Sequence, residues 1–188
     1  MRLFAAVELS PETRDAMAVE QRRLKAALGT AGAPLKWVRP DNAHLTLVFL
    51  GQVPDERVPP IIAALERDID RRAFEITVSG VGLFPERGAP RVLWLGVGAG
   101  SADLIALQRT VAARIADHQI ALDWREFHPH LTLARWPDAR PSDRRRVTSA
   151  GSGIVARQPV AAVTLYESRL LPSGARYSAL TRANLTGA

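Results

Sequence analysis

Apolar and polar residues follow two periods along this chain, one typical of strands and one typical of helices. Mostly apolar runs of strand length lie at residues 2–9, 44–50, 74–84, 91–97, 160–170 and 177–184. Apolar residues three and four positions apart predict helices over residues 11–28 and 55–70 and after residue 101, with a weaker helical pattern near 142–148. Because both periods recur throughout, we expect an α+β fold.

Serine residues mark the expected starts of two helices. Ser10 precedes Pro11 and Glu12, so its hydroxyl is expected to cap a helix that ends at Gly29. Ser101 is expected to cap the later helix in the same way.

The order of the predicted elements repeats once. A strand, a helix and a loop with Trp and Arg are followed by His-Leu-Thr-Leu, first at residues 44–47 and again at residues 130–133. Trp37 precedes its histidine by seven residues and Trp124 by six, and Arg2 and Arg91 head the two units. This is a single duplication, not the longer array that a solenoid needs.

We therefore expect one domain over residues 1–188, built from two lobes at roughly 1–90 and 91–188, an arrangement that allows strands to be exchanged between the lobes. Two similar αβ units packed about a pseudo-two-fold axis would place equivalent strands on either side of one central cleft. Both His-Leu-Thr-Leu strings would then face the same cleft.

The paired histidines are the strongest candidates for chemistry. In a strand, His44 and Thr46 share one face, as do His130 and Thr132, while the leucines enter the core. A single such string is more often a half-buried strand residue with satisfied hydrogen bonds. Two matched copies favour an acid–base pair, because imidazole titrates near neutral pH and one ring can be neutral while the other is protonated.

The charge of the chain favours a phosphorylated or polyanionic partner without deciding the matter. The formal net charge is +6, and nearly all the basic residues are arginines, whose planar fork suits phosphate oxygens. An arginine-rich composition inherited from the source genome explains the same excess equally well. The chain contains no cysteine, no segment apolar enough to cross a membrane and no signal-peptide core, so we expect a cytoplasmic protein.

Aromatic residues gather near both motifs, and most of them are expected to lie in the core. Phe49 is the exception, because we expect it to share the face of His44 and to stack on a nucleobase. The run Arg144-Arg145-Arg146 is expected to form a solvated helix face, with guidance of RNA as the alternative.

Two other kinds of site compete with this interpretation. His44, His128 and His130 could supply three ligands to zinc, although the threonines would then have no role. The glycines at positions 96, 98 and 100 lie between a strand and a helix, but their spacing does not fit a dinucleotide-binding turn.

The motifs and their surroundings resemble the two-histidine (2H) phosphoesterases, and more narrowly the RNA 2′,3′-cyclic phosphodiesterases first described as 2′-5′ RNA ligases. The resemblance spans nearly the whole chain. It is carried by Arg2-Leu3-Phe4-Ala5-Ala6-Val7, His44-Leu45-Thr46-Leu47-Val48-Phe49-Leu50-Gly51, Phe127-His128-Pro129-His130-Leu131-Thr132-Leu133-Ala134-Arg135, Leu165-Tyr166-Glu167-Ser168 and Arg176-Tyr177.

The resemblance implies a bilobal α+β fold with antiparallel sheets flanking a central cleft, and neither a metal nor another cofactor. It makes His44 the proton donor and His130 the proton acceptor. Thr46, Thr132 and Arg135 would bind the substrate phosphate.

The expected activity is metal-independent hydrolysis of RNA 2′,3′-cyclic phosphate ends to 2′-phosphomonoesters, with reversible 2′-5′ ligation as a further reaction. The partner would be RNA or a nucleotide, and we expect a monomer. The alternatives are another 2H activity on small cyclic phosphates and an RNA-binding module without catalysis. Intact His and Thr residues in both motifs argue against the second of these.

Overall fold

The structure is a computed structural model that describes the chain except for residues 30–33, 119, 121–125, 149–152, 173 and 188. Four α-helices are described, with two short 3-10 turns, η1 (Pro40–Asn42) and η2 (Asp55–Arg57). The helices are α1 (Pro11–Leu28), α2 (Val58–Glu66), α3 (Ser101–Ala116) and α4 (Pro141–Thr148). The strands are β1 (Arg2–Glu8), β2 (Lys36–Trp37), β3 (His44–Gln52), β4 (Phe74–Phe84), β5 (Val92–Val97), β6 (His130–Arg135), β7 (Ile154–Val160), β8 (Ala162–Leu171) and β9 (Gly174–Asn184).

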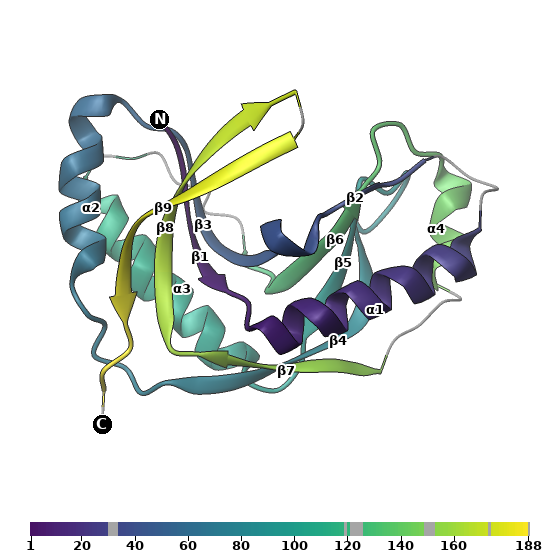
Figure 1. Cartoon of the computed structure of the whole chain (residues 1–188), viewed down its shortest axis with the longest axis horizontal. Helices are drawn as coiled ribbons and strands as arrows, with labels where there is room; N and C mark the ends of the chain where they lie inside the picture. Colours follow the sequence, from purple (N-terminus) through teal and green to yellow (C-terminus); the bar gives the residue numbers. More distant parts are fainter. Residues whose placement is uncertain (30–33, 119, 121–125, 149–152, 173, 188) are drawn as a thin grey trace.

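The strands form two sheets, and every described pair within them is antiparallel (Figure 1). The first sheet has the order β3-β1-β8-β9 and the second the order β2-β6-β5-β4-β7. The expected α+β class with two antiparallel sheets is confirmed. The two motif strands, β3 and β6, lie in different sheets and contact each other.

Each sheet contains strands from both halves of the sequence. β4 precedes the predicted lobe boundary near residue 90 but pairs with β5 and β7 in the second sheet. In return, β8 and β9 come back from the end of the chain to complete the first sheet beside β1. The sheets therefore do not follow the division into residues 1–90 and 91–188.

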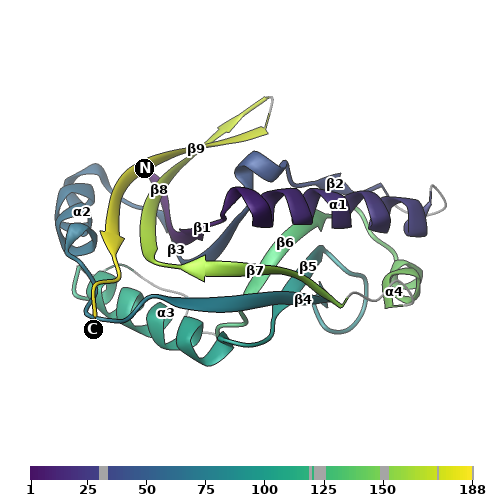
Figure 2. The same cartoon turned by 60° about the horizontal axis from the view of Figure 1, so that its bottom comes forward.

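Helices cover the outer faces of the sheets, so the motif strands can turn their polar face to the space between the sheets. α1 packs on β7, while α2 and α3 contact each other and pack on β9 and β3, respectively (Figure 2). Leu45, Leu47, Leu131 and Leu133 are all buried in the core beneath the sheets, as the alternation predicts. The hydrophobic core thus fixes the orientation of both motif strands.

The predicted helix over residues 55–70 is shorter than expected. Residues 55–57 form a 3-10 turn, and α2 ends at Glu66 because Arg67 is extended, with ψ at 130°. The backbone N–H of Ile69 donates to the carbonyl of Asn184 at 2.8 Å, and Ile69 forms a bridge with Leu185. Pairing with the end of the chain therefore replaces the last predicted helical turn.

The strand predicted over residues 160–170 spans a boundary between two strands. β7 ends at Val160 and β8 begins at Ala162, and the two belong to different sheets. β7 was missed because Arg157, Gln158 and Pro159 interrupt any apolar pattern. Gln158 is nevertheless buried, since its side chain accepts a hydrogen bond from the Ser10 N–H and donates to the carbonyl of Glu8.

One of the two predicted helix caps is confirmed. The hydroxyl of Ser10 accepts a hydrogen bond from the backbone N–H of Thr13 at 3.2 Å. Ser101 is not a cap, because Gly100 takes the N-cap position with φ at 78° and offers no side chain. A Cβ at Gly100 would lie 2.4 Å from the carbonyl oxygen of Glu75, so the close approach of β4 excludes a side chain there.

Candidate active site

The two motif strands have the same irregularity. Thr46 lies opposite Ala6 and Val48 lies opposite Ala5, so Leu47 is an extra residue in β3. Thr132 lies opposite Trp94 and Ala134 lies opposite Leu93, which makes the last leucine of the second motif the extra residue of β6. A bulge of this kind shifts the residues beyond it to the other face of the strand.

The bulges bring the fifth residue after each histidine to the histidine's face. Phe49 was expected on the same face as His44, although strict alternation over five residues would put Phe49 and Arg135 on the other face of their strands from His44 and His130. Instead, both strands show the same burial pattern from the histidine onward: half-buried, buried, half-buried, buried, buried, exposed. Phe49 and Arg135 are therefore equivalent positions at which the two lobes differ, one aromatic and one cationic.

The ladder registers also correct the predicted match of Arg2 with Arg91. Phe4 lies opposite Phe49, and Val92 lies opposite Arg135. In the first repeat, the position equivalent to Arg91 is therefore Leu3, one residue after Arg2.

Both imidazoles are held in the same way. Nδ1 of His44 lies 2.8 Å from the carbonyl oxygen of Asn42, and Nδ1 of His130 lies 2.7 Å from the carbonyl oxygen of His128. Because a carbonyl can only accept, Nδ1 carries the proton in each ring, and Nε2 of the neutral ring is left unprotonated. Each Nε2 is then free to take a proton, or to give one after protonation.

Aromatic side chains fix the plane of each imidazole. Phe4 stacks on His44 with 4.6 Å between ring centroids, and Tyr177 meets His44 edge-on at 5.2 Å. Phe84 meets His130 edge-on at 5.0 Å, with Trp94 at 6.2 Å. These four residues were not predicted as site residues, because they come from β1, β4, β5 and β9 and nothing local links them to the motifs.

Burial and nearby positive charge lower the pKa of both histidines. For each ring the largest cause is burial, which disfavours the charged imidazolium; the hydrogen bond to the backbone carbonyl opposes it. The charge of Arg135 lowers the pKa of both His44 and His130, and His130 further lowers that of His44. One cation therefore acts on both imidazoles, as expected for rings carried by the contacting strands β3 and β6.

A cavity of about 670 Å³ opens beside His130. Residues from β3, from the turn between β4 and β5 and from the segment before β6 line it: Thr46, Leu47, Val48, Phe49, Phe84, Pro85, Glu86, Arg91, Val92, Glu126, Phe127, His128 and His130. Of the six predicted site residues, Thr46, Phe49 and His130 line the cavity. His44 and Arg135 interact electrostatically with His130, and Thr132 lies opposite Trp94 on the neighbouring strand.

Gly82 makes room for the ring that supports His130. A Cβ at Gly82 would lie 2.1 Å from two atoms of the Trp94 indole. We expect Gly82→Ala to displace Trp94 and to lower the free energy of unfolding by about 1–3 kcal/mol, the usual cost of overpacking, with a parallel loss of activity. Thermal unfolding and turnover measure both effects. Gly153→Ala is the matched control, because nothing lies within 4 Å of the Cβ that alanine would add there. Equal melting temperatures for the two variants would contradict this role for Gly82.

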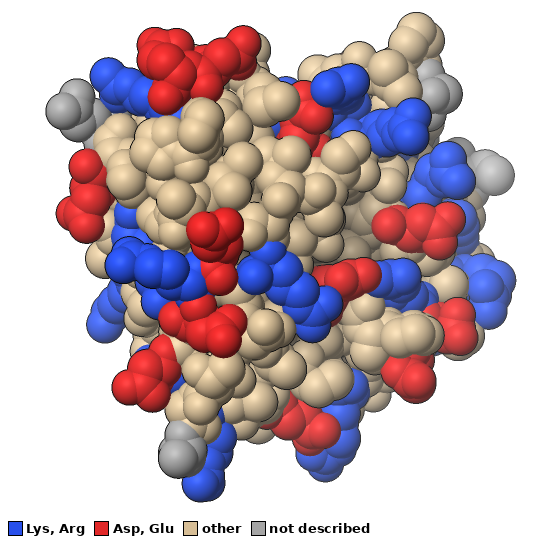
Figure 3. Space-filling view, turned by 60° about the vertical axis from the view of Figure 1, so that its left-hand side comes forward, with Lys and Arg blue, Asp and Glu red and all other residues tan. Residues whose placement is uncertain are grey.

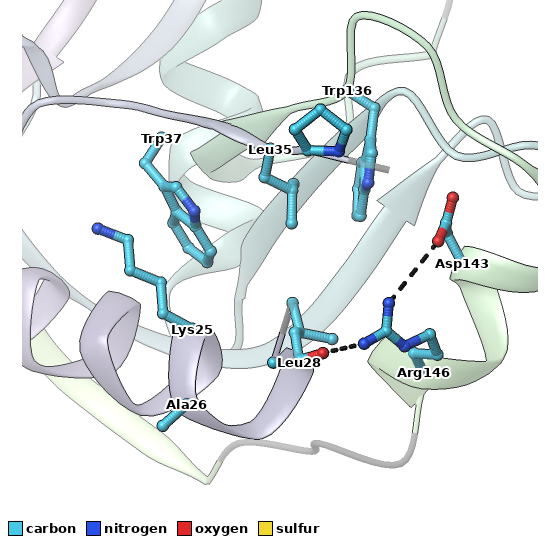
Figure 4. Close-up of a pocket in the computed structure, with 10 residues that line it drawn as sticks. Lys25, Ala26, Leu28, Leu35, Trp37, Trp136, Asp143 and Arg146 are labelled. Carbon is cyan, nitrogen blue, oxygen red and sulfur yellow. Dashed lines mark hydrogen bonds and ion pairs between the residues drawn. The ribbon is translucent and has the colours of Figure 1, made fainter. Parts of the chain in front are cut away.

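A second cavity, of about 490 Å³, lies away from the histidines between α1, β2 and α4 (Figure 4). Lys25 lies over the ring of Trp37, with Nζ 5.0 Å from its centroid. Arg146 donates to the carbonyl of Leu28 and forms an ion pair with Asp143 at 4.0 Å. Arg146, the last residue of the arginine run that was expected to face solvent, therefore connects α4 to the end of α1.

On the face shown in Figure 3, basic and acidic side chains are interspersed and form no patch of a single sign. Within the described residues, no group of three His, Cys, Asp or Glu side chains is placed to hold a metal ion. The loop with Trp124 lies outside the described residues. No described helix is both long and apolar enough to span a membrane.

Two antiparallel sheets, each contributing one His-x-Thr strand to a shared site, define the class of the protein as a two-histidine phosphoesterase. Comparison with family models gives the particular family. The model described as LigT-like phosphoesterase matches residues 7–94 and, a second time, residues 95–177. The chain belongs to this family, and its two matches correspond to the two repeats of the sequence.

Similar proteins cover nearly the same length. An RNA 2′,3′-cyclic phosphodiesterase from Aeropyrum pernix is 34% identical, over 84% of this chain and 90% of its own. One from Archaeoglobus fulgidus is 33% identical, over 96% of this chain and 98% of its own. The crystal structure of a protein from Thermus thermophilus matches with a TM-score of 0.81 at 31% identity, over 100% of this chain and 99% of that one. The crystal structure of Escherichia coli LigT complexed with 3′-AMP matches with a TM-score of 0.76 at 28% identity, over 98% of this chain and 97% of that one.

Proposed function

We propose that this protein hydrolyses RNA 2′,3′-cyclic phosphate ends to 2′-phosphomonoesters. The observation that carries the proposal is the pair of imidazoles. In each ring Nδ1 is hydrogen-bonded to a backbone carbonyl, and the charge of Arg135 lowers the pKa of both rings. Relatives named RNA 2′,3′-cyclic phosphodiesterase, similar over most of the chain, support the same reaction. The structure of LigT with 3′-AMP supports a nucleotide as ligand.

The reaction needs one neutral and one protonated histidine. Nε2 of His130, in the neutral ring, takes a proton from water as the water oxygen bonds to phosphorus. The bond from phosphorus to the 3′ oxygen breaks, and protonated His44 gives its Nε2 proton to that oxygen. Because the substrate is an anion, its presence raises the pKa of His44 and so favours the protonated ring that the step requires.

The remaining predicted residues stabilise and orient the phosphate. The hydroxyls of Thr46 and Thr132 donate to non-bridging oxygens, and the guanidinium of Arg135 compensates the charge that develops on them. Phe49, which is 47% exposed, holds the terminal base by stacking. If a 5′-hydroxyl of another RNA replaces water, the same step forms a 2′-5′ linkage.

The first test is product analysis with a defined RNA that ends in a 2′,3′-cyclic phosphate. We expect turnover in excess EDTA and a product with its phosphate on the 2′ oxygen, since the proposed step uses only side chains of this chain. Chromatography against 2′- and 3′-phosphate standards identifies the product. Loss of activity in EDTA with rescue by zinc would instead favour the metal site, and a 3′-phosphate product would reject the proposed direction of ring opening.

A further inference from the structure

A hollow of about 560 Å³ lies beside Phe49, separate from the cavity that His130 lines. Residues at the ends of β1, β3 and β8 form it, namely Met1, Arg2, Phe49, Gly51, Gln52, Ser168 and Leu170. Phe49 lines both spaces. A nucleotide stacked on this ring would therefore have the reacting phosphate on one side and this hollow within reach on the other.

Cross-strand pairing gathers three hydrogen-bonding side chains in the hollow. Arg2 lies opposite Gln52, while Leu3 lies opposite Glu167, which brings Ser168 next to Arg2 on the other side of β1. This row lies two residues along β1 from the pairing of Phe4 with Phe49. Two residues of a strand correspond to about 7 Å, so the row lies one step beyond the base-stacking position.

Arg2 supplies the side-chain positive charge of the hollow, while the ammonium group of Met1, which also lines it, pairs with Asp55 at 3.3 Å. The guanidinium carbon of Arg2 lies 5.1 Å from the centroid of the Phe49 ring, which orients the side chain. The lining residues include no carboxylate, and no ion pair joins Arg2 to a carboxylate within the part of the chain that the structure describes. An oriented guanidinium of this kind suits phosphate oxygens.

We propose that Arg2, with Gln52 and Ser168, binds the phosphodiester that joins the terminal nucleotide to its 5′ neighbour. The proposal rests on the proposed function and extends it by naming the side chains that would hold the RNA chain on the 5′ side of the reacting nucleotide. In RNA the cyclic phosphate and this phosphodiester lie at opposite ends of one nucleoside. A base on Phe49 would thus direct one phosphate to the histidines and the other toward Arg2.

The side chain of Leu170 fits the same occupant. It is 70% exposed at the rim of the hollow, where it offers an apolar surface to the sugar or base of the preceding nucleotide. Guanidinium, amide and hydroxyl donors beside an apolar rim match a phosphodiester that carries a nucleoside.

The test compares three substrates: adenosine 2′,3′-cyclic phosphate, the same compound with a 5′-phosphate, and the dinucleotide ending in a 2′,3′-cyclic phosphate. We expect kcat/KM to be higher for the second and third, because each carries the phosphate that Arg2 binds. Arg2→Gln should remove about ten- to a hundredfold of that advantage, the effect of one charge-assisted hydrogen bond, while the first substrate loses much less. Ser168→Ala should remove a smaller part.

Controls separate the subsite from other causes. Arg22→Gln removes one exposed cation on α1, outside the site, and should leave all three values unchanged. An equal loss for the three substrates in Arg2→Gln would mean that Arg2 acts only by orienting Phe49, and it would overturn the subsite. Equal wild-type kcat/KM for the three would also overturn it, while leaving the proposed function intact. Absence of turnover for every substrate would reject both proposals.

Discussion

Replacing His44 or His130 by alanine is expected to lower kcat by at least about 10²-fold, because each acid or base contributes about 10²–10⁴-fold to such a reaction. Each ring takes part in one proton transfer, and the aromatic rings of Phe4, Tyr177, Phe84 and Trp94, which pack against the two imidazoles, are not acids or bases that titrate near neutral pH. Steady-state turnover of a 2′,3′-cyclic phosphate measures the loss. Circular dichroism should show that both variants remain folded.

A matched control uses another histidine of the chain. His118 follows α3 and takes no part in the site, so His118→Ala should keep wild-type turnover. A His44→Ala enzyme with near wild-type activity would end the two-histidine mechanism. A loss confined to one of the two variants would mean that the reaction needs a single acid or base.

The near-symmetry of the site explains why the histidines alone do not identify acid and base. Both rings are bonded through Nδ1 to a carbonyl two residues earlier, and burial lowers the pKa of both. The lobes differ at the fifth residue after each histidine, where one presents Phe49 and the other Arg135. We therefore expect substrate orientation, fixed at these two positions, to assign the roles.

Local patterns in the sequence were sufficient to predict most strands, the long helices and the shared face of each His-x-Thr pair. These features depend on side-chain period, on turn residues and on caps such as Ser10, all of which act within a few residues. The duplication added the convergence of the two motifs, since equivalent strands of two similar units lie side by side. The confirmed α+β class follows from the same patterns.

Long-range pairing determined the features that the sequence did not predict. Ile69 leaves its helical period to pair near the end of the chain, and β4 joins a sheet made mostly of later strands. The bulges at Leu47 and in β6 depend on registers with β1 and β5. Phe49 does share the face of His44, as expected, but alternation over five residues would have put it on the other face, so only the bulge accounts for its position. The aromatic walls of the histidines come from four separate strands and carry no local signal.

Arg135 variants are expected to separate the charge of the arginine from its shape. Arg135→Lys keeps one positive charge but loses the planar fork, so we expect kcat/KM to fall by about tenfold or more, as one charge-assisted hydrogen bond is lost. Arg135→Gln loses both the charge and the fork and should be the less active of the two. Steady-state kinetics with one defined cyclic phosphate compares them directly.

The pH dependence distinguishes the same two variants. A neutral base and a protonated acid give a bell-shaped profile, and the limbs of kcat/KM report the coupled pKa values of the free enzyme. Because the charge of Arg135 lowers the pKa of both His44 and His130, its removal in Arg135→Gln should raise both pKa values and move the whole bell to higher pH. Arg135→Lys keeps the charge, so its bell should stay near the wild-type position while its height falls. A profile that rises monotonically through the histidine range would contradict the acid–base pair, and an unshifted bell in Arg135→Gln would show that Arg135 does not set the protonation of the two imidazoles.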